Sequence, residues 1–89
     1  MDPLPTGSTS TLRVLNGSGD TSVQWDRERL AAGDAEARAA VAEAERIFVR
    51  ARASGALAFR VMPGKPAVRI QRFDPEAREV LVIPAMVGG

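Results

Sequence analysis

One segment of this chain has the composition and spacing of a long amphipathic helix, and it limits the folds that the other residues can adopt. Residues 34–55 are dominated by Ala, Glu and Arg, which favour helices. Asp34 can accept a hydrogen bond from a free amide of the first turn, and Gly55 is a natural stop beyond the last turn. Apolar side chains recur between them at helical spacing: Ala37, Val41, Ala44, Phe48 and Ala51, with Ile47 beside Phe48. This stripe must be buried against another layer of structure.

The segments on both sides of this helix have the patterns of β-strands. They are residues 11–14, 21–25, 57–61, 68–71 and 79–83. The first two flank a Gly-rich turn at 16–20, which predicts a β-hairpin. In the third, Leu57, Phe59 and Val61 alternate with Ala58 and Arg60, which predicts a half-buried strand. The last is apolar on both faces, as expected of a central strand.

These elements predict an α+β protein, in which one helix packs across a mixed sheet of four to five strands. The first hairpin is antiparallel, and the last strand best fits the centre of the sheet beside the first strand. That arrangement is a β-grasp. We expect a flexible leader at residues 1–10, the folded domain at 11–84 and an extended tail at 85–89.

The composition argues against several classes of function. The chain has 89 residues and no Cys, His or Tyr, so most of the usual catalytic and metal-binding side chains are missing. We therefore expect neither an enzyme nor a metal or cofactor site. The net charge of +1 comes from scattered basic and acidic residues, which is not typical of nucleic-acid binding. The longest apolar run is far shorter than the roughly 20 residues of a membrane span, and the N-terminus lacks a secretory signal, so we expect a cytoplasmic protein.

The end of the sequence resembles a known family. Residues 79–89 read Glu-Val-Leu-Val-Ile-Pro-Ala-Met-Val-Gly-Gly, so a strand runs through Pro84 into a terminal Gly88-Gly89. This is similar to the ends of ubiquitin-like proteins, and most of all to the small sulfur carriers of molybdopterin synthase. The hairpin at 11–26 and the helix at 34–53 resemble the corresponding parts of the same family.

The resemblance implies a function for the tail. An E1- or ThiF-like enzyme would adenylate the carboxylate of Gly89 with its own ATP, and glycines at 88 and 89 would allow the tail to enter a narrow channel. The acyl group would pass to sulfur as a thiocarboxylate, or through an E2-like enzyme to a target lysine, from which a JAB-type peptidase could release it. Pro84, Met86 and Val87 would be recognised in the tail. Because residues 84–87 are uncharged, unlike the basic ubiquitin tail, a bacterial-style activating enzyme is expected.

Another class of function stays open. A β-grasp domain can also serve as a non-covalent interaction module or a phage-related structural subunit, because fold alone does not decide function.

The other conspicuous residues have structural explanations. Trp25 is expected to anchor the core or its rim. Asp20, Asp26 and Asp74 lie at predicted turns or strand ends, where Asp is favoured for backbone reasons, rather than forming a metal site. The only lysine, Lys65, lies in a Pro-Gly-Lys-Pro turn, and Arg69 and Arg72 are expected on a solvated face.

Overall fold

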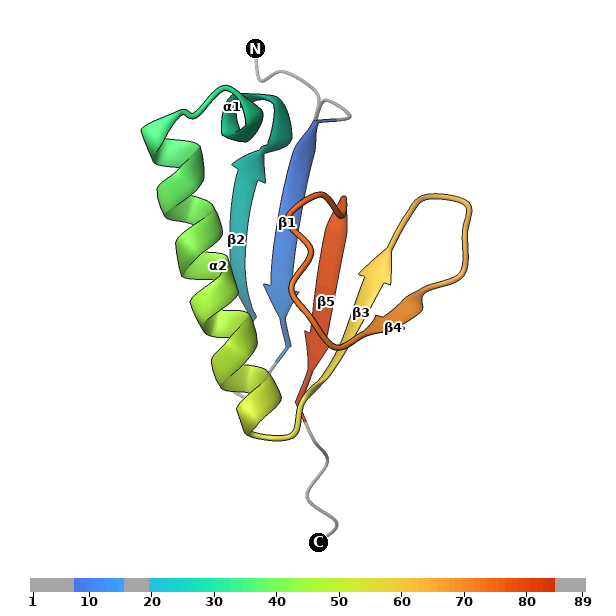
Figure 1. Ribbon diagram of the computed structural model, residues 1–89. Helices are drawn as coiled ribbons and strands as arrows, with labels where there is room; N and C mark the ends of the chain where they lie inside the picture. The colour runs from blue at the N-terminus through green and yellow to red at the C-terminus, as the bar shows by residue number, and fades with distance from the viewer. Residues whose placement is uncertain (1–7, 16–19, 85–89) are drawn as a thin grey trace, which may run out of the picture.

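Five strands form one mixed sheet, and a long helix crosses one of its faces (Figure 1). The computed structural model describes residues 8–15 and 20–84. In chain order, the elements are β1 (Thr9–Val14), β2 (Thr21–Asp26), α1 (Arg27–Ala31), α2 (Ala35–Ala53), β3 (Leu57–Val61), β4 (Val68–Ile70) and β5 (Glu79–Ile83). The strand order in the sheet is β2-β1-β5-β3-β4. The prediction of an α+β fold with a mixed sheet is confirmed.

The last strand, β5, lies at the centre of the sheet. It pairs in parallel with β1, where Leu12 is opposite Val80, and antiparallel with β3, where Ala58 is opposite Val82. Val80 and Val82 are fully buried on the side of the helix. The predicted position of this strand beside the first strand is therefore confirmed.

The first two strands form the predicted antiparallel pair, but β1 begins earlier than expected. It starts at Thr9, with Ser10 opposite Trp25, whereas residues up to 10 were expected in a flexible leader. The hydroxyl of Ser10 is fully buried and donates to the carbonyl of Ala77 at 2.7 Å. This bond holds the start of β1 against the segment before β5. The turn residues 16–19 lie outside the described residues.

Helix α2 has the predicted ends and the predicted buried face. The carboxylate of Asp34 accepts a hydrogen bond from the amide of Ala37 at 3.0 Å, which caps the first turn. At the other end, Gly55 has a φ of 93°, a left-handed conformation that favours glycine. The buried residues of the helix are Ala37, Ala44 and Phe48.

The prediction of one helix packed across the sheet is confirmed by α2, but the short helix α1 that precedes it was not predicted. Asp26, expected only to end a strand, also caps α1: its carboxylate accepts from the amides of Glu28 at 2.8 Å and Arg29 at 3.2 Å. Gly33, with a φ of 82°, then turns the chain into α2. The sequence signal for five helical residues is too short to separate from a loop.

The buried side of β3 is not formed by its large side chains. Ala58 is fully buried between Val82 of β5 and Ile70 of β4, while Leu57 is 37% exposed. Cross-strand partners share a face, so Leu57, Phe59 and Val61 lie on the face away from α2. The strand was predicted correctly, but its register with β5 decides which side chains enter the core.

A loop at residues 71–78 completes the core beside α2. The ring of Phe73 lies 5.6 Å from that of Trp25 and 5.7 Å from that of Phe48, between ring centroids. The indole of Trp25 donates to the carbonyl of Pro75 at 3.0 Å. These contacts join β2, α2 and the loop. Within residues 8–15 and 20–84, no helix is both long enough and apolar enough to cross a membrane.

Candidate functional site

The predicted tail begins where the central strand leaves the sheet. Pro84 follows β5 directly and is exposed. Ala85, Met86, Val87, Gly88 and Gly89 lie outside the described residues. Of the residues expected to be activated or recognised, the structure therefore places Pro84 alone.

Pro84 lines a small apolar pocket at this end of the sheet. The pocket has a volume of about 260 Å³ and is lined by Val14, Leu15, Ala51, Ser54, Ala56, Val82 and Pro84. Its walls come from β1, β5 and the end of α2, and its chemistry suits one or two aliphatic side chains.

A second apolar surface lies on the face of the sheet opposite α2. Register places Phe59 beside Leu81 and Leu57 beside Ile83, and we call these four residues the outer-face patch. Phe59, Leu81 and Ile83 are half-buried by their neighbours and Leu57 is exposed. Because Ile83 directly precedes Pro84, the patch extends to the start of the tail.

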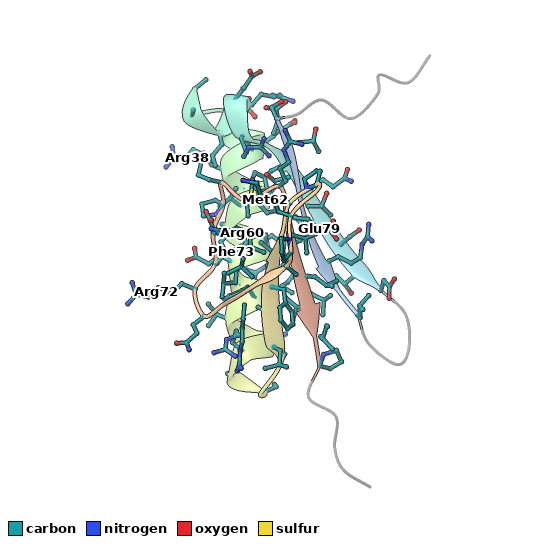
Figure 2. All side chains as sticks on the ribbon, turned by 90° about the vertical axis from the view of Figure 1, so that its right-hand side faces the viewer. Arg38, Arg60, Met62, Arg72, Phe73 and Glu79 are labelled. Carbon is teal, nitrogen blue, oxygen red and sulfur yellow. The ribbon has the colours of Figure 1, made fainter. Side chains whose placement is uncertain are left out.

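The side view separates the two faces of the sheet (Figure 2). Phe73 and Arg72 lie on the side of α2, whereas Glu79 lies on the opposite side. Glu79 pairs with Arg13 of β1 at 3.9 Å on this outer face. No described helix or loop covers the outer-face patch (Figure 2). An uncovered apolar group bordered by charged side chains is the usual composition of a protein-binding surface.

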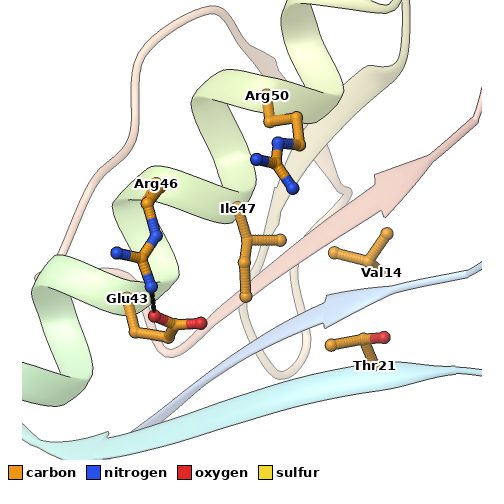
Figure 3. Close-up of a pocket in the computed structure, with 6 residues that line it drawn as sticks. All are labelled: Val14, Thr21, Glu43, Arg46, Ile47 and Arg50. Carbon is orange, nitrogen blue, oxygen red and sulfur yellow. Dashed lines mark hydrogen bonds and ion pairs between the residues drawn. The ribbon is translucent and has the colours of Figure 1, made fainter.

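A third feature is a cleft between α2 and the hairpin end of the sheet (Figure 3). It has a volume of about 490 Å³ and is lined by Val14, Thr21, Glu43, Arg46, Ile47 and Arg50. Glu43 and Arg46 form an ion pair one helical turn apart. Arg50 has no ion pair with any described residue.

The acidic residues considered as metal ligands have backbone roles. Asp26 caps α1, and the carboxylate of Asp74 accepts from the amide of Glu76 at 3.0 Å. Asp74 also pairs with Arg60 of β3 at 3.6 Å. Asp20 is exposed at the start of β2. Among the described residues, no group of three or more acidic side chains is placed to hold a metal ion.

Trp25 lies in the core and the basic residues Lys65, Arg69 and Arg72 lie on the surface, as the sequence predicted. Trp25 is 4% exposed and belongs to the core, which confirms its role as an anchor. Lys65 lies exposed in the loop between β3 and β4, and its amide donates to the carbonyl of Met62 at 3.2 Å. Arg69 and Arg72 are exposed.

Sequence reasoning missed the outer-face patch and the cleft. The alternation in β3 and the apolar pairs in β5 signalled strands, but only the register between them shows that Phe59 and Leu81 share the uncovered face. The cleft joins Arg50 of α2 to Thr21 of β2, a pair that no local pattern links.

No family model, curated protein or solved structure matches this chain.

Proposed function

We propose that this chain is a ubiquitin-like β-grasp modifier or sulfur carrier that an E1- or ThiF-like enzyme activates at the carboxylate of Gly89. The observation that carries the proposal is the position of β5. This strand is held on both sides, by β1 and β3, and leads through Pro84 into residues that end in Gly88-Gly89. The partner enzyme would then hold the folded domain while the tail reacts.

The arrangement of the sheet supports the β-grasp assignment. The first and last strands pair in parallel at the centre, an antiparallel hairpin precedes the helix, and α2 lies across one face (Figure 1). Those are the features that the resemblance to ubiquitin-like proteins requires. The short helix α1 between the hairpin and α2 is compatible with them, because it packs beyond the end of β2 (Figure 1).

In this reaction the carrier itself contributes only a carboxylate. The carboxylate of Gly89 attacks the α-phosphate of ATP held by the partner, and pyrophosphate leaves. A thiol or a sulfur donor of the partner then displaces AMP from the acyl adenylate. Glycine at both terminal positions leaves no side chain to block the reacting carbon. The partner supplies ATP, magnesium and the catalytic groups, which agrees with the lack of Cys and His in this chain.

The outer-face patch is the surface that we assign to the activating enzyme. It is apolar, uncovered by described elements, and continuous with Ile83 and the start of the tail. An enzyme that held this patch would fix the direction in which the tail enters its active site. Residues Pro84, Met86 and Val87 would then follow the partner's channel.

A second candidate is a non-covalent interaction module, and the outer-face patch is the observation that favours it. Such a module would use Phe59 and Leu81 in the same way but would not need Gly88-Gly89. The two functions therefore differ in the role of the tail and agree on the role of the patch.

To test the proposal, the chain is expressed with a free carboxylate at Gly89 and incubated with ATP, magnesium and purified ThiF-like enzymes. A carrier forms a C-terminal adenylate, and with a sulfur donor a thiocarboxylate, both visible by intact mass spectrometry. Deletion of Gly88-Gly89 should abolish the product and leave the circular dichroism unchanged. Phe59→Ser should lower the rate of adenylation, because it removes part of the docking surface. A module that keeps its cellular partners after the deletion, and forms no adenylate, would establish the second candidate instead.

A further inference from the structure

The apolar pocket beside Pro84 lies where the chain leaves the sheet. β1 and β5 run parallel, and both end on the side of the domain where α2 also ends (Figure 1). The pocket, of about 260 Å³, opens between these three ends. None of its lining residues carries a charge, and Ser54 alone among them has a polar side chain. The pocket therefore suits an apolar group rather than an ion.

The alternation of side chains along β5 indicates which tail residue would meet this pocket. Val82 is buried on the α2 side of the sheet, and Pro84, two residues further on, lines the pocket with it. Side chains two residues apart lie on the same face of an extended chain. The next residue in this series is Met86, whereas Val87 continues the series of Ile83, which lies on the outer face. One tail side chain is thus singled out.

Met86 also has the reach and the shape that the pocket requires. It follows Pro84 by two residues, which span about 7 Å in an extended chain. Because Pro84 is itself part of the pocket wall, that length is enough to bring the side chain over the opening. Methionine is unbranched and flexible, and it fills irregular apolar gaps well.

We propose that the pocket binds the side chain of Met86 from the same chain and that this contact holds the tail against the domain. Met86 lies outside the described residues, so its place is inferred from the pocket and the sequence. Its side chain packs against Val82 of β5 and Ala51 of α2. Gly88-Gly89 follow beyond the contact and have no side chains to join it.

Docking of Met86 regulates the activation proposed above, and this consequence rests on that function. An enzyme that draws the tail into its channel must first remove Met86 from the pocket. A tail docked for about nine-tenths of the time lowers the apparent affinity of that enzyme about tenfold, because only the free fraction can bind. The outer-face patch stays open, since the pocket lies on the α2 side of the sheet. The enzyme can therefore bind the domain before it takes the tail.

The docking is tested by nuclear magnetic resonance on the full chain, isotope-labelled at the methyl groups of methionine, valine and leucine. Nuclear Overhauser contacts are expected between the methyl group of Met86 and those of Val14, Leu15 and Val82. Met62 is the internal reference, because it is 37% exposed and follows the last residue of β3, at the other end of the sheet. It should show none of these contacts. A soluble paramagnetic chelate should broaden the methyl resonance of Met62 more than that of Met86.

Two pairs of variants separate this contact from its alternatives. Met86→Ser should shift the methyl resonances of Val82, and Val87→Ser should leave them in place. Ala51→Leu fills the pocket from α2 and should remove the contacts of Met86. Ala53→Leu adds the same atoms at an exposed position in the same turn, outside the pocket, and should keep them. Circular dichroism checks that both helix variants keep the fold.

The adenylation assay measures the consequence separately. With the chain below saturation, Ala51→Leu should be adenylated faster, by up to about tenfold for a tail docked as above, and Ala53→Leu at the rate of the parent chain. Equal rates for all three proteins, with the contacts of Met86 present, would refute the regulatory step. If no variant is adenylated while the contacts are present, the proposed function fails and the docking stands.

Four results would overturn the docking itself. The first is the absence of contacts between Met86 and the methyl groups of the pocket, and the second is equal broadening of Met86 and Met62 by the chelate. The third is contacts that arise only between chains in a mixture of differently labelled copies, which would assign the pocket to a second copy. The fourth is contacts that persist in Ala51→Leu when its circular dichroism matches the parent chain.

Discussion

Replacing Phe73 by alanine is expected to destabilise the fold by about 3 kcal/mol. The ring of Phe73 contacts those of Trp25 and Phe48, and each tilted aromatic pair contributes about 0.5–1.5 kcal/mol beyond burial. Removing a half-buried phenyl ring from the core cluster costs about a further 1–2 kcal/mol. The loss is a large share of the roughly 4–13 kcal/mol expected for a chain of this length.

The assay is urea denaturation followed by tryptophan fluorescence. Trp25 is the only tryptophan in the chain, so its emission reports on the contact that the substitution removes. Phe73→Ala should lower the urea midpoint. It should also shift the native emission of Trp25 to longer wavelength, because water reaches the indole from the loop side.

The matched control is Val68→Ala, which removes an aliphatic side chain that is 47% exposed on β4. It is expected to change stability by no more than about 0.5 kcal/mol. If Phe73→Ala costs less than about 1 kcal/mol, or no more than the control, then the loop at 71–78 does not close the core as described.

Three further predictions concern the core, one turn and one helix cap. Ala58→Leu should cost about 1–3 kcal/mol in urea denaturation, because a larger side chain would press on Val82; a neutral result would mean that Ala58 does not face the core. Gly33→Ala should cost about 1–2 kcal/mol in thermal denaturation, since no atom crowds the new methyl group and only the φ of 82° opposes it. The hydrogen bond from the amide of Ala37 lowers the pKa of Asp34, so its capping is complete above the ordinary aspartate pKa and is lost as pH falls through the lowered value. The helical signal in far-ultraviolet circular dichroism should therefore fall more in acid for the parent chain than for the Asp34→Asn variant, whose cap does not titrate. Equal loss of signal in the two proteins would contradict this account.

Local signals in the sequence predicted much of the fold. Asp34 and Gly55 mark the ends of α2 because capping depends on neighbouring backbone groups only. The apolar run of β5 predicted a central strand, and the pairing with β1 and β3 confirms that position. Such features depend on residues close together in the chain.

Features that depend on pairing between distant segments could not be predicted. The side chains of β3 alternate between the two faces of the sheet. Only the register of β3 with β5 shows that Ala58 lies in the core and that Phe59 lies on the outer face. The short helix α1 has too few residues to show a helical repeat of apolar side chains, although Asp26 is a residue type that favours the N-cap position. The tail residues Gly88 and Gly89 were proposed from a motif, and their role stays a prediction that only the adenylation assay tests.

The central position of β5 has a consequence for the order in which the domain can form. The strands before it make two separate antiparallel pairs, β1 with β2 and β3 with β4, which share no direct pairing. During synthesis, neither pair can join the other until Glu79–Ile83 has left the ribosome. Proteolytic trimming that reaches Glu79–Ile83 would likewise remove the middle of the sheet instead of an edge, so a chain shortened into β5 should unfold and be degraded, whereas loss of Gly88-Gly89 alone should leave the sheet intact.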